Sequence, residues 1–536
     1  MDLLFTFKSA LKQYMYPVTG VNIGVIPDWI KGSLYRNGPG KFEVGSDKYS
    51  HSFDGLAMVQ RYYINDGKVT FQSQYIQSKS YLRNMAANRI VVSEFGTTAY
   101  PDPCRSIFNR LSNFFENEMT DNTSVCVFPV GDELFTSTET DVIHRIDPVD
   151  LTTIGSVRFP NIVTVNRATA HNHIDKETGL VHFLGFANYP VPSYAFFTIP
   201  PIKKEDSSRL NEKYDMEKLL TGAKIVGKIN ARWKLNPSYY HSFGITENYY
   251  IHLECPLTIS IVDMMKTKIW SSSIAEAFKW WPQEKTIIHV MDRNSGELLS
   301  HVYVTDPLFT FHHINAYEDK GHIVIDYCGY DNGYVVMNLF VDSLKDKFPK
   351  SAPSSPRRLI VPLKFDEKSA CDINLISLPN TNCTANIVEN RNDKCVVHCH
   401  HEELSDNAFM ELPTINYNAY NGKKYRYLYG VAENMLKKVD TETKTSIVWC
   451  NEEPGYACES IFVKHPNADD NNPEDEDYGI LLTPILVRDK TVDTERYQSL
   501  VFIDAKSMKE ICRTEFRSVS IPLSFHGVFQ PINSLG

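Results

Sequence analysis

The chain has 536 residues, of which 42% are hydrophobic and 12% aromatic, so it can bury a large core and is not expected to be disordered. Its formal charge of −10 argues against a nucleic-acid-binding surface. The 11 cysteines follow no regular spacing, which indicates reduced thiols in a cytosolic protein and excludes a disulfide framework.

The first 20 residues do not read as a targeting segment. They contain Lys8 and Lys12 and lack the apolar core and small-residue cleavage site of a signal peptide. No window of the chain has the roughly 18 uninterrupted apolar residues of a transmembrane helix. We therefore expect a cytoplasmic protein, in which the sequons at Asn122 and Asn382 are not glycosylated.

Short strands separated by turns make up most of the chain. A hairpin pattern recurs, in which an apolar run ends in Asp, turn residues follow and a second apolar run begins. It occurs at Asp147, Asp175, Asp292, Asp440 and Asp504. Repeated hairpins of this kind predict the blades of an all-β propeller, although tandem sandwiches would look similar. Because a closed ring can take several hundred residues, we expect residues 1–536 to form a single domain.

Two segments interrupt the strand pattern, residues 104–118 and 264–283. Both carry bulky apolar side chains among basic ones, which suits a segment lying in a membrane surface. Helices that cap the β structure would have similar sequences, so both interpretations stand. The candidate membrane-facing residues are Cys104, Ile107, Phe108, Leu111, Phe114, Phe115, Trp270, Phe278, Trp280 and Trp281.

Four histidines recur in similar settings, namely His171, His241, His312 and His526. Their separations are 70, 71 and 214 residues, and the last is about three times the others. A repeat of 71 residues fits a seven-bladed ring in which matching strands aim one histidine at the axis. An all-imidazole set suits iron, copper or zinc, whereas each histidine taken alone could be an ordinary one. Strand neighbours face opposite ways, so only one of His312 and His313 would face the axis, and the pattern does not say which.

Three glutamates lie in apolar or small-residue contexts: Glu139, Glu411 and Glu459. Glutamate is rarely buried unless it is paired. A metal-bound imidazole donates its second N–H to an acceptor, so these carboxylates would have partners beside a metal. The alternative is that they occupy solvent-facing strand positions.

A denser cluster, CVVHCHHEE, contains Cys395, His398, Cys399, His400 and His401. It looks like a zinc site, but structural zinc sites bring two separated ligand pairs together, and no clear second pair lies nearby in the sequence. We therefore expect this cluster to be a loop or a strand edge.

The motifs around the four histidines and three glutamates resemble those of the carotenoid cleavage oxygenases, from about Tyr16 to the end of the chain. They are GSLYRNGPGKFE, HSFDGLAM, STET, ATAHNH, PSYYHSFGITENY, FHHINAYED, ELPTINY, ESIFVKHP and SFHGVF. The resemblance implies a seven-bladed β-propeller with a helical and loop cap over the iron-bearing face. It also implies Fe(II) held on the axis by the four histidines, with Glu139, Glu411 and Glu459 orienting three of them. Many relatives have Pro where this chain reads AHNH, which affects only the local turn.

The resemblance further implies an enzyme that adds O₂ to one double bond of a carotenoid such as zeaxanthin or β-carotene and releases two retinal-type aldehydes. PDPC, ending at Cys104, resembles the animal branch, whose members attach peripherally to membranes, and it makes Cys104 a candidate for acylation. Insect members, which this chain resembles most, both cleave and isomerise, giving one 11-cis product.

Two other functions remain open. One is a retinoid ester isomerohydrolase that uses the same fold and iron without O₂, and the other is a binding propeller without chemistry. The complete histidine and glutamate set argues against a simple binding propeller. The motifs PSYYHSFGITENY and TDPLFTFHHINAYED resemble the cleaving enzymes more closely than the isomerase, which favours cleavage.

Overall fold

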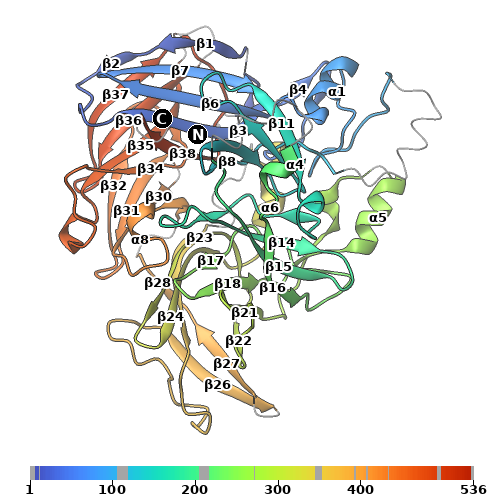
Figure 1. The fold of residues 1–536 in the computed structure, drawn as a ribbon, viewed down its shortest axis with the longest axis vertical. Coiled ribbons are helices and arrows are strands. Elements are labelled where there is room, and N and C mark those ends of the chain that lie inside the picture. The colour runs from blue at the N-terminus through green and yellow to red at the C-terminus, as the bar shows by residue number, and fades with distance from the viewer. Residues whose placement is uncertain are drawn as a thin grey trace.

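A computed structural model describes residues 7–532 except 11, 105–118, 204–215, 271, 345–352, 392–393, 406–408, 433, 490 and 492–495. Seven sheets of four to six strands follow one another around a common centre (Figure 1). The predicted all-β, seven-bladed propeller is confirmed.

The first blade closes the ring, because it combines strands from both ends of the chain (Figure 1). Its register sets Gly32 opposite Pro531 and Asn37 opposite His526. A ring closed in this way leaves no open gap between its first and last blades. The strands, in order across the sheet, are β1 (Tyr14–Thr19), β7 (Lys68–Tyr75), β6 (Leu56–Asn65), β3 (Gly32–Lys41) and β38 (His526–Pro531).

The second to fourth blades come next along the chain. The second has β8 (Cys126–Val130), β9 (Glu133–Ser137), β10 (Val142–Ile146) and β11 (Thr153–Arg158). The third has β12 (Arg167–Ala168), β13 (His173–Ile174), β14 (Val181–Ala187), β15 (Ser193–Ile199) and β16 (Lys224–Asn230). The fourth has β17 (Gly244–Ile245), β18 (Tyr249–Glu254), β21 (Thr286–Asp292), β22 (Val302–Thr305), β27 (Lys394–His400) and β26 (Thr384–Arg391).

The remaining blades complete the ring. The fifth has β23 (Phe309–Asp319), β24 (His322–Tyr330), β25 (Ser355–Pro362) and β28 (Glu402–Glu403). The sixth has β29 (Glu411–Thr414), β30 (Tyr427–Ala432), β31 (Met435–Asp440) and β32 (Thr445–Cys450). The seventh has β33 (Gly455–Ala457), β34 (Ile461–Lys464), β35 (Gly479–Arg488), β36 (Arg496–Asp504), β37 (Lys509–Phe516) and β2 (Val21–Ile23).

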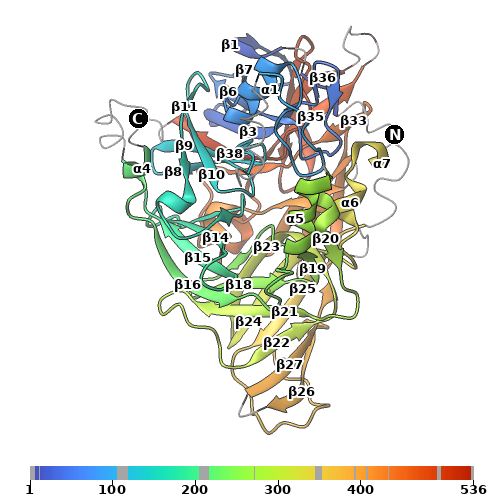
Figure 2. The ribbon, with the colours of Figure 1, turned by 90° about the vertical axis from the view of Figure 1, so that its right-hand side faces the viewer.

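The helices and two small strand pairs lie outside the blades. The helix α1 begins at the cap Ser78, whose side chain accepts from the Tyr81 N–H, and ends at Asn88 in the left-handed conformation. Figure 2 shows α1 and α5 on the side of the molecule that faces the viewer. These elements are α1 (Lys79–Ala87), α4 (Met216–Leu219), α5 (Ile261–Trp270), α6 (Val335–Asn338), α7 (Val341–Leu344), α8 (Tyr417–Tyr420), η2 (Phe159–Asn161), η3 (Ile274–Ala277), η4 (Pro473–Asp475), β4 (Glu43–Val44), β5 (Asp47–Lys48), β19 (Leu257–Ile259) and β20 (Phe278–Trp280).

All five predicted aspartates close turns between strands. For example, Asp147 Oδ1 accepts from the backbone N–H of Val149 at 2.7 Å and of Asp150 at 3.0 Å. Asp175, Asp292 and Asp440 accept in the same way from the amide two residues later, and Asp504 accepts from the amide three residues later. The recurring hairpins are therefore set by side chain-to-backbone bonds that the local sequence encodes.

The apolar core lies between adjacent blades. Phe128 of the second blade packs edge-on against Phe183 of the third, with ring centroids 5.7 Å apart. Likewise, Trp449 of the sixth blade and Leu481 of the seventh belong to one buried cluster. Because the apolar faces of neighbouring blades pack against each other, polar groups can occupy the axis of the ring.

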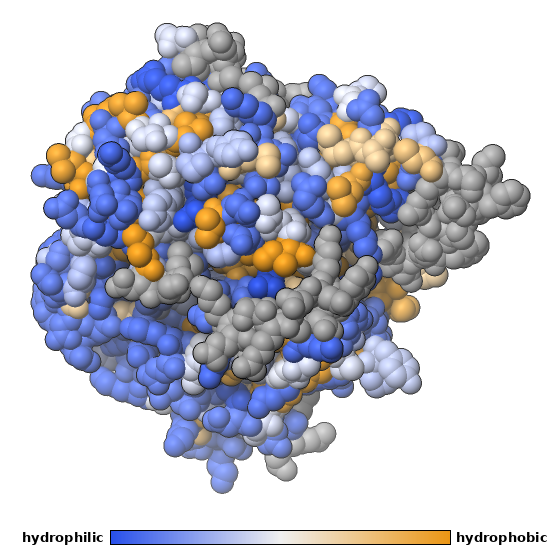
Figure 3. Space-filling model, turned by 45° about the horizontal axis from the view of Figure 1, so that its top comes forward, coloured by the Kyte–Doolittle hydropathy of each residue, from blue (hydrophilic) through white to orange (hydrophobic). Residues whose placement is uncertain are grey.

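Apolar side chains are exposed at several places on the surface of the described residues, among them Tyr16, Val25 and Met265. In Figure 3, the apolar residues of the displayed face form small patches among hydrophilic ones. In the part of the chain that the structure covers, no helix has the length and apolar character needed to cross a membrane.

Candidate metal centre

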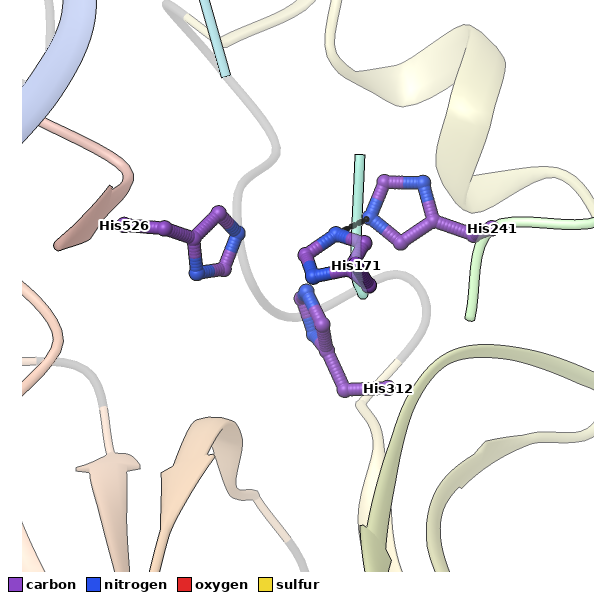
Figure 4. Close-up of side chains that lie close together, drawn as sticks. All are labelled: His171, His241, His312 and His526. Atoms are coloured by element: carbon purple, nitrogen blue, oxygen red, sulfur yellow. Dashed lines mark hydrogen bonds between the residues drawn. The ribbon is translucent and has the colours of Figure 1, made fainter. Parts of the chain in front are cut away.

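Four strands or strand ends bring the four predicted histidines together (Figure 4). His171 lies between β12 and β13, His241 precedes β17, His312 lies in β23 and His526 begins β38. One ring nitrogen from each lies within 4.8 Å of those of the other three. His171 Nε2 and His241 Nε2 are 2.8 Å apart. Four segments up to 355 positions apart in sequence therefore meet at one point.

Three of the imidazoles are held from behind by the three predicted glutamates. His312 Nδ1 lies 2.5 Å from Glu411 Oε2. His526 Nδ1 lies 2.9 Å from Glu459 Oε1, and His241 Nδ1 contacts Glu139 Oε1. Each Nδ1–H donates to a carboxylate, so each Nε2 presents its lone pair to the centre.

The protonation states agree with this arrangement. Burial and the three neighbouring imidazoles hold the pKa of His171 well below its ordinary value. Burial would raise the pKa of Glu411, but His312 and the backbone N–H of Leu412 hold it below its usual range. At neutral pH His171 is therefore a neutral imidazole and Glu411 an ionised carboxylate.

A divalent metal fits these residues. Within the described part of the chain, His312 Nε2 is buried and has no hydrogen-bond partner. A buried nitrogen of this kind needs a partner, and a cation bound by the converging nitrogens would be one. Imidazole nitrogens suit iron, copper and zinc.

His171 is positioned by Thr169 rather than by a glutamate. Its backbone N–H donates to Thr169 Oγ1 at 3.0 Å, and the Thr169 hydroxyl donates to the carbonyl of His241. This threonine couples the two segments that bring His171 and His241 to the axis.

The histidines beside the cluster point elsewhere. His313 Nδ1 lies 2.8 Å from Ser242 Oγ, and His173 Nε2 lies 3.0 Å from the carbonyl of Phe243. The structure therefore brings His312 into the cluster and leaves His313 out.

Arg36 was not identified from the sequence, although its side chain is fully buried. Its guanidinium donates to Glu459 Oε2 at 2.9 Å, to the carbonyl of Phe525 at 2.7 Å and to Ser524 Oγ at 3.1 Å. Arg36 therefore fixes both the carboxylate behind His526 and the segment that leads into it. Its only signal in the sequence was that an arginine stands among the apolar positions of a predicted strand.

Tyr239, which contacts both Glu139 and His241, was also not identified from the sequence. Its hydroxyl donates to Glu139 Oε1 at 3.0 Å and lies 2.8 Å from His241 Nδ1. The two tyrosines that precede His241 in the sequence were the available signal.

The backbone is strained next to one of the glutamates. Leu412 has φ +50°, which a branched side chain rarely adopts, and its N–H donates to Glu411 Oε2 at 2.9 Å. The strained conformation places a donor on the carboxylate that holds His312.

A cavity of about 2070 Å³ opens onto the centre and is lined mainly by apolar and aromatic side chains. His241, His312 and His526 line it, together with Glu139 and Glu411. Near the centre its wall includes Phe311, whose ring centroid is 4.9 Å from that of His241. Elsewhere it reaches Met265 of α5, a side chain that is 67% exposed.

The candidate membrane-facing residues have varied positions. Phe278 lines the cavity and packs against Phe95 at 5.2 Å between centroids. Trp280 and Trp281 are half-buried, and the Trp281 indole N–H donates to Thr258 at 2.9 Å. Cys104 is exposed. Ile107, Phe108, Leu111, Phe114, Phe115 and the side chain of Trp270 lie outside the described residues.

Comparisons with known proteins show similarity over nearly the whole chain. Residues 7–531 match the family model described as retinal pigment epithelial membrane protein. The β,β-carotene 15,15'-dioxygenase of Rattus norvegicus is 36% identical over 99% of this chain and 92% of its own. The mitochondrial carotenoid-cleaving dioxygenase of Homo sapiens is 36% identical over 95% of this chain and 87% of its own. Cobalt-substituted apocarotenoid oxygenase of Synechocystis has a TM-score of 0.76 at 22% identity, covering 99% of this chain and 98% of its own, which shows the shared fold.

Proposed function

Because the chain belongs to the retinal pigment epithelial membrane protein family of carotenoid oxygenases, we propose that it is an Fe(II)-dependent dioxygenase that cleaves a carotenoid centrally. One O₂ adds across one C=C bond, the bond breaks, and each carbon leaves as an aldehyde carrying one oxygen atom. The observation that carries this proposal is a four-imidazole cluster that opens onto an aromatic-lined cavity.

His171, His241, His312 and His526 would hold the iron. The chemistry that ferrous iron supplies when bound is the activation of O₂ toward a carbon–carbon double bond. Four neutral imidazoles leave the divalent charge intact, while the glutamates behind three of them keep each ring in one tautomer and one orientation.

The remaining task of the protein is to hold the substrate. A polyene has almost no polar groups, so aromatic and apolar walls must hold it in position through contact area. Phe311 and Tyr239 lie beside His241, where they would flank the bond to be cut and exclude water from it. No side chain is needed as a nucleophile or general base, because both product oxygens come from O₂.

A polyene is insoluble in water, so we propose that it enters from a membrane surface. The cavity reaches Ile261, Met264 and Met265 of α5, and Met265 is largely exposed. An apolar helix face beside the mouth suits peripheral attachment of a cytoplasmic protein, with Cys104 as a candidate anchor.

We further propose that cleavage is coupled to isomerisation, so that one of the two aldehydes is 11-cis. The wide cavity would hold one half of the polyene bent. The alternative is a retinoid ester isomerohydrolase on the same fold, and the names of the relatives at 36% identity favour cleavage over it.

The test is anaerobic purification, loading with Fe(II), and incubation with zeaxanthin or β-carotene in detergent, followed by admission of O₂ and chromatography. Retinal-type aldehydes that form only with O₂ would support cleavage, and 11-cis product in half of the aldehyde would support coupled isomerisation. An iron-loaded protein that leaves both carotenoids intact, and isomerises a retinyl ester without O₂, would overturn the proposal in favour of the isomerohydrolase.

A further inference from the structure

A second group of imidazoles lies on the fourth blade and is separate from the four-histidine cluster at the axis. His398 and His400 are two positions apart on β27, so both side chains project from the same face of the strand. The intervening Cys399 faces the other way and is fully buried, as is Cys395. The two cysteines are thus turned away from the two histidines. The predicted loop or strand edge is wrong for this segment, because β27 lies inside the sheet between β22 and β26.

A carboxylate from another part of the chain meets these two rings. Asp306 directly follows β22, which pairs in parallel with β27 and sets Val304 opposite His398. Asp306 Oδ1 lies 3.1 Å from His398 Nε2, and Asp306 Oδ2 lies 3.8 Å from His400 Nδ1. The two imidazole centroids are 4.1 Å apart.

These separations suit a tetrahedral metal. One potential ligand atom from each residue lies within 4.8 Å of the other two. Ligands bound to zinc at about 2.0–2.1 Å are separated by roughly 3.3 Å, a value that lies between the two measured nitrogen–oxygen distances. Two imidazoles and one carboxylate are a donor set that zinc accepts, with water as the fourth ligand.

Lys285 competes for the same atoms. Its Nζ lies 3.2 Å from His398 Nε2, 3.4 Å from His398 Nδ1 and 3.5 Å from Asp306 Oδ1. An ammonium group and a dication cannot share these acceptors. The Lys285 side chain is 46% exposed, so it can move into solvent when a metal binds.

We propose that Asp306, His398 and His400 form a Zn²⁺ site that joins the β26–β27 hairpin to β22. The hairpin comes from residues 384–400, about 80 positions after β22, and extends the fourth blade at the lower end of the molecule (Figures 1 and 2). A metal bridging the two segments would stabilise a parallel pairing that no short connection supports. The proposal is independent of the carotenoid chemistry at the axis.

The test is Zn²⁺ binding to full-length, iron-loaded protein at pH 7.5, measured by equilibrium dialysis and metal analysis. We expect one zinc per chain beyond the axial iron. His400→Gln should weaken this binding by about tenfold or more, while His401→Gln, the neighbouring control, should leave it unchanged. Retention of axial iron by each variant would show that it is folded.

A second variant, Lys285→Met, gives a more specific test because it removes the positive charge that competes with the metal. We expect zinc to bind about fivefold more tightly to this variant, and zinc to raise the Tm of wild type but not of His400→Gln. Equal zinc affinity in wild type and His400→Gln, or weaker binding to Lys285→Met, would overturn the proposal.

Discussion

Arg36 is the residue on which the orientation of His526 most depends. Its buried guanidinium balances the charge of Glu459, which in turn accepts from His526 Nδ1. We expect Arg36→Met to destabilise the protein by about 3–5 kcal/mol, because it leaves a buried carboxylate without its cation. Urea unfolding measures this loss.

Arg36 could stabilise the fold only, or it could also orient His526 for metal binding. The metal content of folded variants distinguishes these two roles. Arg61→Met is the control, since Arg61 is nearly buried in the same blade but bonds to Ser33 and the Val149 carbonyl, away from the histidines. We expect folded Arg36→Met to lose metal and folded Arg61→Met to retain it. Full metal content in both variants would contradict the role assigned to Arg36.

His252 is a single residue whose buried ring should make the stability of the folded protein depend on pH. Both of its ring nitrogens are buried without a partner among the described residues, and burial, with His289 nearby, lowers its pKa to about 3. Because the folded pKa is depressed, the unfolded chain takes up a proton first as the pH falls below about 6.5, and stability is lost from there toward pH 3.

We therefore expect His252→Phe to remove part of this acid sensitivity. At pH 5 the buried neutral ring costs wild type roughly 2 kcal/mol relative to pH 7.5, a cost that phenylalanine does not carry. Urea unfolding of both proteins at the two pH values measures the difference. Parallel pH profiles would show that His252 is protonated in the folded chain.

At the scale of residues, the sequence was informative where a pattern repeats. The spacing of four histidines and the apolar contexts of three glutamates pointed to the residues that gather at the axis, but the choice between His312 and His313 came only from the resemblance to the carotenoid cleavage oxygenases. Arg36 could not be predicted, because its partner Glu459 lies 423 positions away and only the closed ring brings the two together. The strained backbone of Leu412 likewise depends on the folded surroundings of Glu411.

At the scale of elements, the pairing of β3 with β38 closes the ring and carries His526. Gly527 allows this close approach, since a Cβ there would lie 2.2 Å from the Tyr35 carbonyl and 2.6 Å from Arg36 Cδ. We expect Gly527→Ala to cost about 3 kcal/mol, because backbone atoms must move apart. Gly67→Ala, with φ +68° and open space around it, should cost only about 1 kcal/mol. Equal thermal stability of the two variants would contradict this account of ring closure.

The turns were predictable from the sequence but the pairing of β27 was not. Each turn aspartate bonds to amides two or three residues later, so its effect is encoded locally. In contrast, β27 returns to the fourth blade after the fifth has begun, and pairs in parallel with β22. Local patterns do not contain a long-range pairing of that kind.

At the scale of the whole molecule, the ring is held by contacts between neighbouring blades and by the residues that meet at the axis. A metal bound by His171, His241, His312 and His526 would connect segments from distant blades. Since a ligand that binds only the folded chain stabilises it by about 4 kcal/mol at a thousandfold excess over its Kd, removal of the metal by a chelator should lower the Tm by several degrees. In His312→Ala the Tm should be insensitive to the chelator, and an identical response in both proteins would contradict a metal that bridges the blades.

The most direct test of the central claim is iron K-edge X-ray absorption on the anaerobically purified protein, together with its iron content. We expect one iron per chain and a nearest shell of nitrogen or oxygen, with the outer scattering of four imidazole rings. A chain without iron that still cleaves carotenoid, or an iron shell containing sulfur or fewer imidazoles, would contradict a centre built from the four histidines.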